Sequence, residues 1–130
     1  VCSSDLELGK FCTSVSCIDG RVQIPVISWL KENHGIDYVD TITEPGMDKS
    51  FSNSSKMEEI KSKVLISVNA HGSQLILVSG HHDCAGNPVS KSDHIQHIKN
   101  TMKVILSWNL PVKVLGAWVN ENWEIETVNS

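Results

Sequence analysis

The chain has 130 residues, of which 40% are hydrophobic and 20% are charged, values typical of one soluble globular domain. Its formal net charge is −4 and Arg21 is its only arginine, so the composition argues against a nucleic-acid partner. No apolar run approaches the roughly 20 residues that span a membrane, and no signal peptide is visible. The sequence therefore predicts a cytoplasmic protein.

The first nine residues stand apart from the rest of the chain. Val1 to Leu6 resemble a translated sequencing adapter, so we expect residues 1–9 to be disordered or artefactual. Residues 10–130 then form a single domain with a modest hydrophobic core. The four cysteines could make two disulfides, but two of them occur at spacings typical of metal ligands, and cytoplasmic thiols stay reduced.

The rest of the sequence alternates between strand-like and helix-like patterns. Helices are predicted where apolar residues recur at helical spacing, and strands where short apolar runs are bounded by turn residues. Residues 48–53 have neither pattern and are expected to be irregular. Ser55 and Glu58 form a predicted capping box at the start of a helix. The predicted strands cover 10–17, 36–42, 74–79, 112–119 and 123–128, and the predicted helices cover 22–33, 55–71 and 92–108.

This order of elements predicts an α/β fold. Strands that alternate with helices form a mainly parallel central sheet flanked by helices on both faces. In such a fold, ligands bind at the carboxyl ends of the strands, where the strand order reverses. Cys17, His81 and Cys84 all lie at predicted carboxyl ends, so we expect them at one edge of the sheet.

These three residues suggest a metal site. His81 and Cys84 lie three residues apart in the loop that follows an apolar strand, so both side chains can reach one ion. With Cys17 they make a set of two thiolates and one imidazole, which suits zinc. Three protein ligands leave a fourth tetrahedral position for water or substrate, and Asp19 is placed to assist there.

Two plainer interpretations compete with this open metal site. Free cysteines such as Cys17 and Cys84 are often small buried hydrophobic residues. A purely structural zinc is the second alternative, although such a site usually needs four fixed protein ligands. We favour the open site.

Two short motifs resemble the zinc signature of the β-class carbonic anhydrases. The first is Cys17-x-Asp19-x-Arg21, and the second is His81-x-x-Cys84 after an apolar strand. The sequence is similar to the short prokaryotic carbonic anhydrase-like proteins over nearly its whole length after residue 9. The resemblance implies a zinc lyase that hydrates carbon dioxide to bicarbonate, with Cys17, His81 and Cys84 as metal ligands.

The same resemblance implies that Asp19 and Arg21 form a catalytic pair beside the metal. Asp19 could accept a hydrogen bond from the attacking water and orient it toward carbon dioxide. Alternatively, Asp19 could bind zinc and close the site, as in part of that family. An ordinary surface ion pair, worth at most about 1 kcal/mol, is the structural alternative.

Three further histidines and one aspartate have open roles. His82 is a candidate for proton transfer, because imidazole titrates near neutral pH, or for replacing His81 as ligand; a histidine bonded to nearby backbone is the plainer interpretation. Asp83 could orient an imidazole or cap the loop. His94 and His97 could form a metal pair on one helix, but we expect solvated surface residues.

The sequence also departs from the β-class pattern. Thr43-Glu44-Pro45-Gly46 stands where that family has an Arg-Asn-Ala-Gly-Asn-like stretch, and residue 82 is His where the family usually has Ser. A homodimer is still expected from the resemblance, with support from Trp123 and Ile125, which look exposed near the C-terminus. These departures bear on the substrate, on the rate and on the hydration activity itself.

The leading hypothesis from the sequence is a carbonic anhydrase-like zinc enzyme whose substrates are carbon dioxide and bicarbonate. One alternative is a hydrolase of a related small molecule such as COS or CS2. Another is a non-catalytic zinc-binding or sensor module that keeps the ligands without the activity. Neither nucleic acid nor a membrane is expected as a partner.

Overall fold

A computed structural model describes residues 9–129, in which strands and helices alternate as predicted. The segment expected to be disordered or artefactual lies outside the described residues, apart from Gly9. The strands are β1 (Phe11–Cys17), β2 (Tyr38–Glu44), β3 (Leu75–His81), β4 (Lys113–Val119) and β5 (Ile125–Val128). The helices are α1 (Gly20–His34), α2 (Met47–Ser50), α3 (Ser54–His71) and α4 (Lys91–Ser107).

The strands form one sheet in the order β2-β1-β3-β4-β5. All neighbouring pairs are parallel except β4 with β5, which confirms the predicted mainly parallel sheet. The chain passes from β1 outward to β2 and then crosses back to β3 on the other side of β1. The strand order therefore reverses between β1 and β3, and the carboxyl ends of these strands, Cys17 and His81, border that point.

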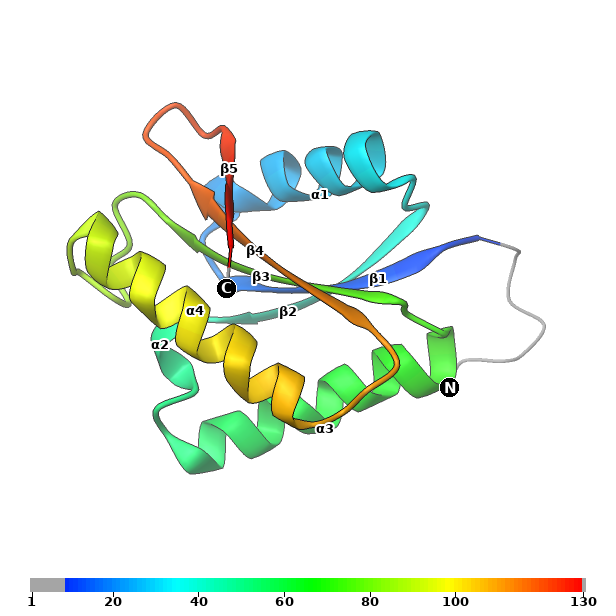
Figure 1. The fold of residues 1–130 in the computed structure, drawn as a ribbon. Helices are drawn as coiled ribbons and strands as arrows, with labels where there is room; N and C mark the ends of the chain where they lie inside the picture. Colours follow the sequence, from blue (N-terminus) through cyan, green and yellow to red (C-terminus); the bar gives the residue numbers. More distant parts are fainter. Residues whose placement is uncertain (1–8, 130) are drawn as a thin grey trace.

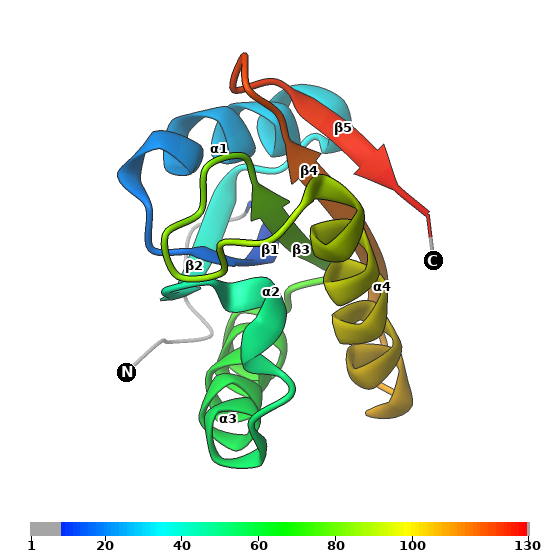
Figure 2. The ribbon, with the colours of Figure 1, turned by 90° about the vertical axis from the view of Figure 1, so that its left-hand side faces the viewer.

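Helices cover both faces of the sheet (Figure 1). Helix α1 lies on one face, and α3 and α4 lie on the other together with the short α2 (Figure 2). Each face has its own hydrophobic core, with Val22, Val26 and Leu30 packing from α1 and Val64 and Ile98 from the opposite helices. No helix within residues 9–129 is long and apolar enough to cross a membrane.

Helix α1 connects the first strand to the second and begins beside the candidate site. Its buried residues Val22, Val26 and Leu30 recur every four positions, which places them on one side of the helix. The Asp19 side chain caps the amino end by accepting from the backbone N–H of Arg21. Gly35 ends the helix in the left-handed conformation that glycine adopts without strain.

The expectation of irregular structure over residues 48–53 was wrong for residues 48–50. Residues Met47–Ser50 form α2, which follows Gly46 at φ +60° and buries Asp48 to 3% exposure. A buried carboxylate is tolerated there because a distant histidine pairs with it, a contact that no local pattern contains. The predicted capping box was also wrong, since Asn53 caps α3 by accepting from the backbone N–H groups of Ser55 and Lys56.

Candidate metal centre

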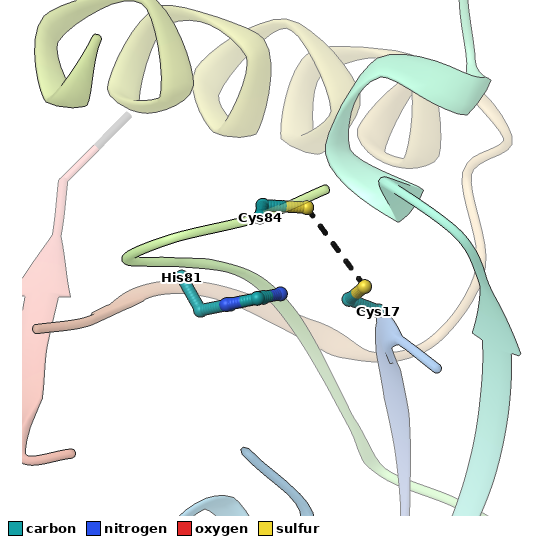
Figure 3. A group of neighbouring side chains, drawn as sticks. All are labelled: Cys17, His81 and Cys84. Carbon is teal, nitrogen blue, oxygen red and sulfur yellow. Dashed lines mark hydrogen bonds between the residues drawn. The ribbon is translucent and has the colours of Figure 1, made fainter. Parts of the chain in front are cut away.

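Two cysteines and one histidine meet at the carboxyl edge of the sheet, where the strand order reverses (Figure 3). Cys17 ends β1, His81 ends β3, and Cys84 lies in the loop that follows β3. All three side chains are buried, and the atoms that could bind a metal lie within 4.8 Å of one another. The structure thus brings together the three residues that the sequence predicted as ligands.

The two thiols are reduced and close together. Their Sγ atoms lie 3.9 Å apart, far beyond the roughly 2.05 Å of a disulfide bond, and both cysteines are free. This separation is short enough for both sulfur atoms to contact one ion of zinc-like size.

His81 has one ring nitrogen in use and one without a partner. Its Nδ1 lies 2.7 Å from the backbone carbonyl oxygen of His82, so Nδ1–H donates and Nε2 carries the lone pair. Among the described residues, the buried Nε2 atom has no hydrogen-bond partner. A buried lone pair beside two thiols fits a metal ion, because leaving it unsatisfied costs free energy.

The two thiols have different acidities. Burial raises the pKa of Cys17, but the His81 ring in its protonated form and the backbone N–H groups of Asp19 and Gly46 outweigh it and lower this pKa to about 7. At Cys84, burial and the neighbouring Cys17 raise the pKa to about 11. The pKa of His81 is raised, because Cys17 and nearby oxygens outweigh its burial. Ionising both thiols at once therefore calls for a cation between them.

Asp19 and Arg21 form a two-pronged ion pair at the rim of this cluster. The Arg21 Nε atom donates to Asp19 Oδ1 at 3.0 Å, and Nη2 donates to Oδ2 at 2.6 Å. The hydrogen bonds from Arg21 lower the pKa of Asp19 to about 2 despite partial burial, and they raise the pKa of Arg21. Asp19 Oδ2 lies 3.9 Å from the free Nε2 of His81, so the charged carboxylate borders the cluster.

Arg21 has two further partners besides Asp19. Its guanidinium donates to the Asp83 carboxylate at 3.2 Å and to the Asp83 backbone carbonyl at 3.1 Å. The carboxylate of Asp83 thus contacts Arg21, whereas the sequence suggested an imidazole or a loop cap. The indole ring of Trp123 lies 4.6 Å from the guanidinium carbon, a cation–π distance. The sequence did not suggest this contact, because Trp123 lies in the turn between β4 and β5, far from Arg21 along the chain.

The other histidines lie outside the cluster. His82 is exposed, its backbone N–H donates to Val119, and its ring lies 6.5 Å from that of Trp123. His94, expected on the surface, is 2% exposed and contacts Asp48 at 2.5 Å, so that expectation was wrong. His97 is half-buried and contacts Asn87. The described residues contain no second cluster of three metal-binding side chains.

Comparison with protein families gives one match over almost the whole chain. Residues 7–129 match the family described as "Putative carbonic anhydrase". The chain belongs to this carbonic anhydrase family. A comparison with curated proteins finds no match.

Solved structures with the same fold include β-carbonic anhydrases. Isoform I of Trichomonas vaginalis superposes with a TM-score of 0.65 at 18% identity, covering 90% of this chain and 81% of that one. The carbonic anhydrase of Glaciozyma antarctica also has a TM-score of 0.65, at 14% identity, covering 97% and 87%. A tetrameric β-carbonic anhydrase of Sordaria macrospora has a TM-score of 0.59 at 13% identity, covering 94% and 81%.

These similarities confirm the predicted family and fold of this carbonic anhydrase relative. The solved structures, at 13–18% identity, by themselves establish the fold alone. The roles of individual residues, from the three expected ligands to Asp19 and Arg21, stay predictions. The cluster is able to hold a metal ion, as its donor atoms and its partnerless imidazole nitrogen indicate.

Proposed function

We propose that this protein is a zinc enzyme that interconverts carbon dioxide and bicarbonate. The observation that carries the proposal is the buried cluster of Cys17, His81 and Cys84 at the switch point of the sheet, with an imidazole nitrogen that has no other partner. Two thiolates and one imidazole suit zinc. Membership of the carbonic anhydrase family supports the reaction.

The chain supplies three of the four ligands that zinc ordinarily takes. A zinc ion held there would polarise a water molecule so that its oxygen could attack carbon dioxide. Cys17 and Cys84 would bind as thiolates, and His81 would bind through Nε2 because its Nδ1–H is already donated to His82. That backbone contact fixes both the tautomer and the orientation of the ring.

Asp19 is the residue we assign to orienting the attacking water. Its carboxylate is an acceptor without a proton of its own, because Arg21 lowers its pKa to about 2. An acceptor at the edge of the cluster can take a hydrogen bond from water and point a lone pair toward the substrate. Arg21 would hold Asp19 in place, with Asp83 and Trp123 fixing the guanidinium in turn.

A closed, non-catalytic metal site is the second candidate, and one observation favours it. The Oδ2 atom of Asp19 lies only 3.9 Å from Nε2 of His81, so a modest rotation of the carboxylate would make it a fourth ligand. Two thiolates, one imidazole and one carboxylate would then leave no position for water. Such a site would serve a structural or sensing role.

Stopped-flow measurement of carbon dioxide hydration on the purified, zinc-loaded protein tests the proposal. We expect a rate above the buffer background that rises in proportion to the zinc content of the sample. The same protein stripped by a chelator is the control. A fully zinc-loaded protein whose rate equals the background would contradict the proposal and favour the closed site. Parallel assays with COS and CS2 test a related hydrolysis.

We also propose that the protein acts in the cytoplasm. Cys12, Cys17 and Cys84 are all free thiols, and the proposed ligand role requires two of them to stay reduced. Reducing compartments keep thiols in that form. Fractionation of cells that express the tagged protein would check this assignment.

A further inference from the structure

A second buried polar cluster lies between α2 and α4, next to the loop that contains Cys84. It contains Asp48 on α2 and His94 on α4, whose side chains are each 2% exposed and lie 2.5 Å apart. Figure 2 shows α2 next to the loop that leads from β3 to α4, the loop that contains Cys84. The proposed reaction does not use either residue.

The hydrogen bonds of this cluster connect it to that loop through Asn87. Asp48 accepts from His94 Nδ1–H through Oδ2 and from the Asn87 side-chain amide, at 3.1 Å, through Oδ1. The amide nitrogen of Asn87 also lies 3.0 Å from Nδ1 of His97. Because an amide NH2 has two hydrogens, one can go to each acceptor, and the orientation of Asn87 is fixed.

Asn87 in turn holds the loop around Cys84. The backbone N–H of Asn87 donates to the carbonyl oxygen of Cys84 at 3.3 Å. On the other side of Cys84, Arg21 donates to the carbonyl oxygen of Asp83 at 3.1 Å. The backbone around Cys84 is therefore held on both sides, by the hydrogen bond from Arg21 to Asp83 and by the hydrogen bond from Asn87 to Cys84.

The segment that contains Asp48 also borders the other two expected ligands. Gly46, just before α2, directs its backbone N–H to the thiol of Cys17. The backbone of Gly80, next to His81, packs so closely on Asp48 that a methyl group there would lie 2.9 Å from Oδ2. One short segment thus contacts the surroundings of all three metal-binding side chains.

A buried pair of polar side chains is a poor source of stability, because the cost of removing both groups from water offsets their attraction. A better-supported role of such a buried pair is to fix the conformation of the residues packed around it. Asp48 can do this because both of its carboxylate oxygens are engaged, one by His94 and one by Asn87.

We propose that the buried Asp48–His94 pair positions Cys84 for metal binding by holding Asn87. Neither residue touches the metal or the substrate, so both are positioning residues. The inference rests on the metal-binding part of the proposed function.

The first test uses metal-free protein and measures how fast iodoacetamide alkylates Cys84, by mass spectrometry under reducing conditions. Asn87→Ala removes the side-chain amide that anchors residue 87 to Asp48, and Asp48→Asn places an amide donor where the Asn87 amide needs an acceptor. We expect either change to raise the alkylation rate of Cys84 by about tenfold, the effect of one lost hydrogen bond to a charged group. The buried thiol of Cys12 reports general unfolding, and its rate should not change.

The second test measures zinc affinity by competition with a chelator. Asn87→Ala and Asp48→Asn should weaken zinc binding by roughly 10- to 100-fold, as changes outside the ligand set commonly do. Asp40→Asn is the matched control, because Asp40 contacts His71 at 2.6 Å on the far strand β2. This control should leave the zinc affinity and the alkylation of Cys84 unchanged.

Parent-like alkylation and parent-like zinc affinity in Asn87→Ala would overturn the inference. Should Asp48→Asn fail to fold, Asn87→Ala still decides, since it leaves the contact between Asp48 and His94 intact. The inference and the proposed function can fail separately. A parent protein that takes up no zinc contradicts the proposed function, whereas the alkylation measurement on metal-free protein tests the positioning of Cys84 by itself.

Discussion

Asp19 shows how one residue can serve both the fold and the site. Its carboxylate caps α1 through the backbone N–H of Arg21 and pairs with the guanidinium of the same residue. Its second oxygen faces the free nitrogen of His81. Because the same carboxylate caps a helix, binds Arg21 and borders the cluster, its effects on structure and on chemistry have to be separated by experiment.

Asp19→Asn separates the catalytic site from the closed one. If Asp19 orients water, the variant should retain zinc but lose at least about a hundredfold in kcat, because the amide is uncharged and can donate where an acceptor is needed. Zinc content, melting temperature and carbon dioxide hydration are the measurements. Loss of zinc and a lower melting temperature, in a parent that never turned over, would show that Asp19 is a fourth ligand.

Arg21→Ala tests whether the ion pair keeps Asp19 away from the metal. We expect zinc to be retained and hydration to slow by roughly 10-fold or more, since Asp19 is then free to occupy the open position. The double variant with Asp19→Asn should be no slower than the slower single variant, because residues that act as one unit are not additive. Additive losses would mean that the two residues act independently.

The unequal acidity of the two thiols predicts how zinc uptake depends on pH. Cys84, with a pKa of about 11, must lose its proton to bind, while Cys17, at about 7, is already partly ionised near neutral pH. Zinc uptake at pH 7 should therefore release about one proton or more per ion, and affinity should fall as the pH is lowered. Calorimetry in buffers of different ionisation enthalpy measures the release.

Cys84→Ser should bind little zinc; full occupancy would mean that Cys84 is not a ligand.

At the scale of elements, the turn before α2 packs against the loop that contains Cys84. Gly46 has φ +60°, and a Cβ atom there would lie 2.5 Å from the carbonyl oxygen of Gly86. The turn and the loop therefore meet backbone to backbone, which leaves no room for a side chain. This contact explains why glycine stands at both positions.

Gly46→Ala should destabilise the protein by more than backbone strain alone. An alanine at positive φ costs about 1–2 kcal/mol, and the overlap with Gly86 should add roughly 1–3 kcal/mol. Gly72→Ala is the matched control, because Gly72 has φ +67° but nothing within 4 Å of its Cβ position. Urea unfolding of both variants gives the comparison, and equal losses would show that the Gly46–Gly86 contact is unimportant.

At the scale of the whole molecule, the chain has the fold of solved carbonic anhydrases. It covers 81% of the Trichomonas vaginalis enzyme and 87% of the Glaciozyma antarctica enzyme. Among these structural relatives, the Sordaria macrospora enzyme is tetrameric. Trp123 and Ile125, expected to be exposed, are instead partly buried against the hydrophobic core, so that expectation was wrong. Among the apolar side chains that remain exposed, Ile18 at 61% and Ile24 at 76% give this chain a surface that a second copy could cover.

We expect a homodimer in solution at micromolar concentration. Analytical ultracentrifugation should give a species of about twice the 14.3 kDa chain mass. Replacing the exposed Ile24 by Lys should shift the equilibrium toward monomer if that face is covered, because a charge is costly to bury. A parent protein that sediments as a monomer would remove the prediction.

Several features of this protein could be predicted from its sequence because they depend on local order in the chain. The alternation of patterns predicts the parallel sheet, and the ends of its first and third strands predict where Cys17 and His81 meet. The spacing from His81 to Cys84 is likewise a property of one short loop. Strand ends shifted by a few residues, as in β2, because pairing with β1 over its whole length sets them.

Other features were decided only by tertiary structure. Trp123 reaches Arg21 across a chain separation of about a hundred residues, and Asp48 is buried because His94 meets it from another helix. A polar residue is predicted to lie on the surface until its partner is known, because burying a polar side chain is stable only when its hydrogen bonds are satisfied. The three residues of the metal-capable cluster were therefore visible in the sequence, whereas the residues packed around them became visible only once the chain was folded.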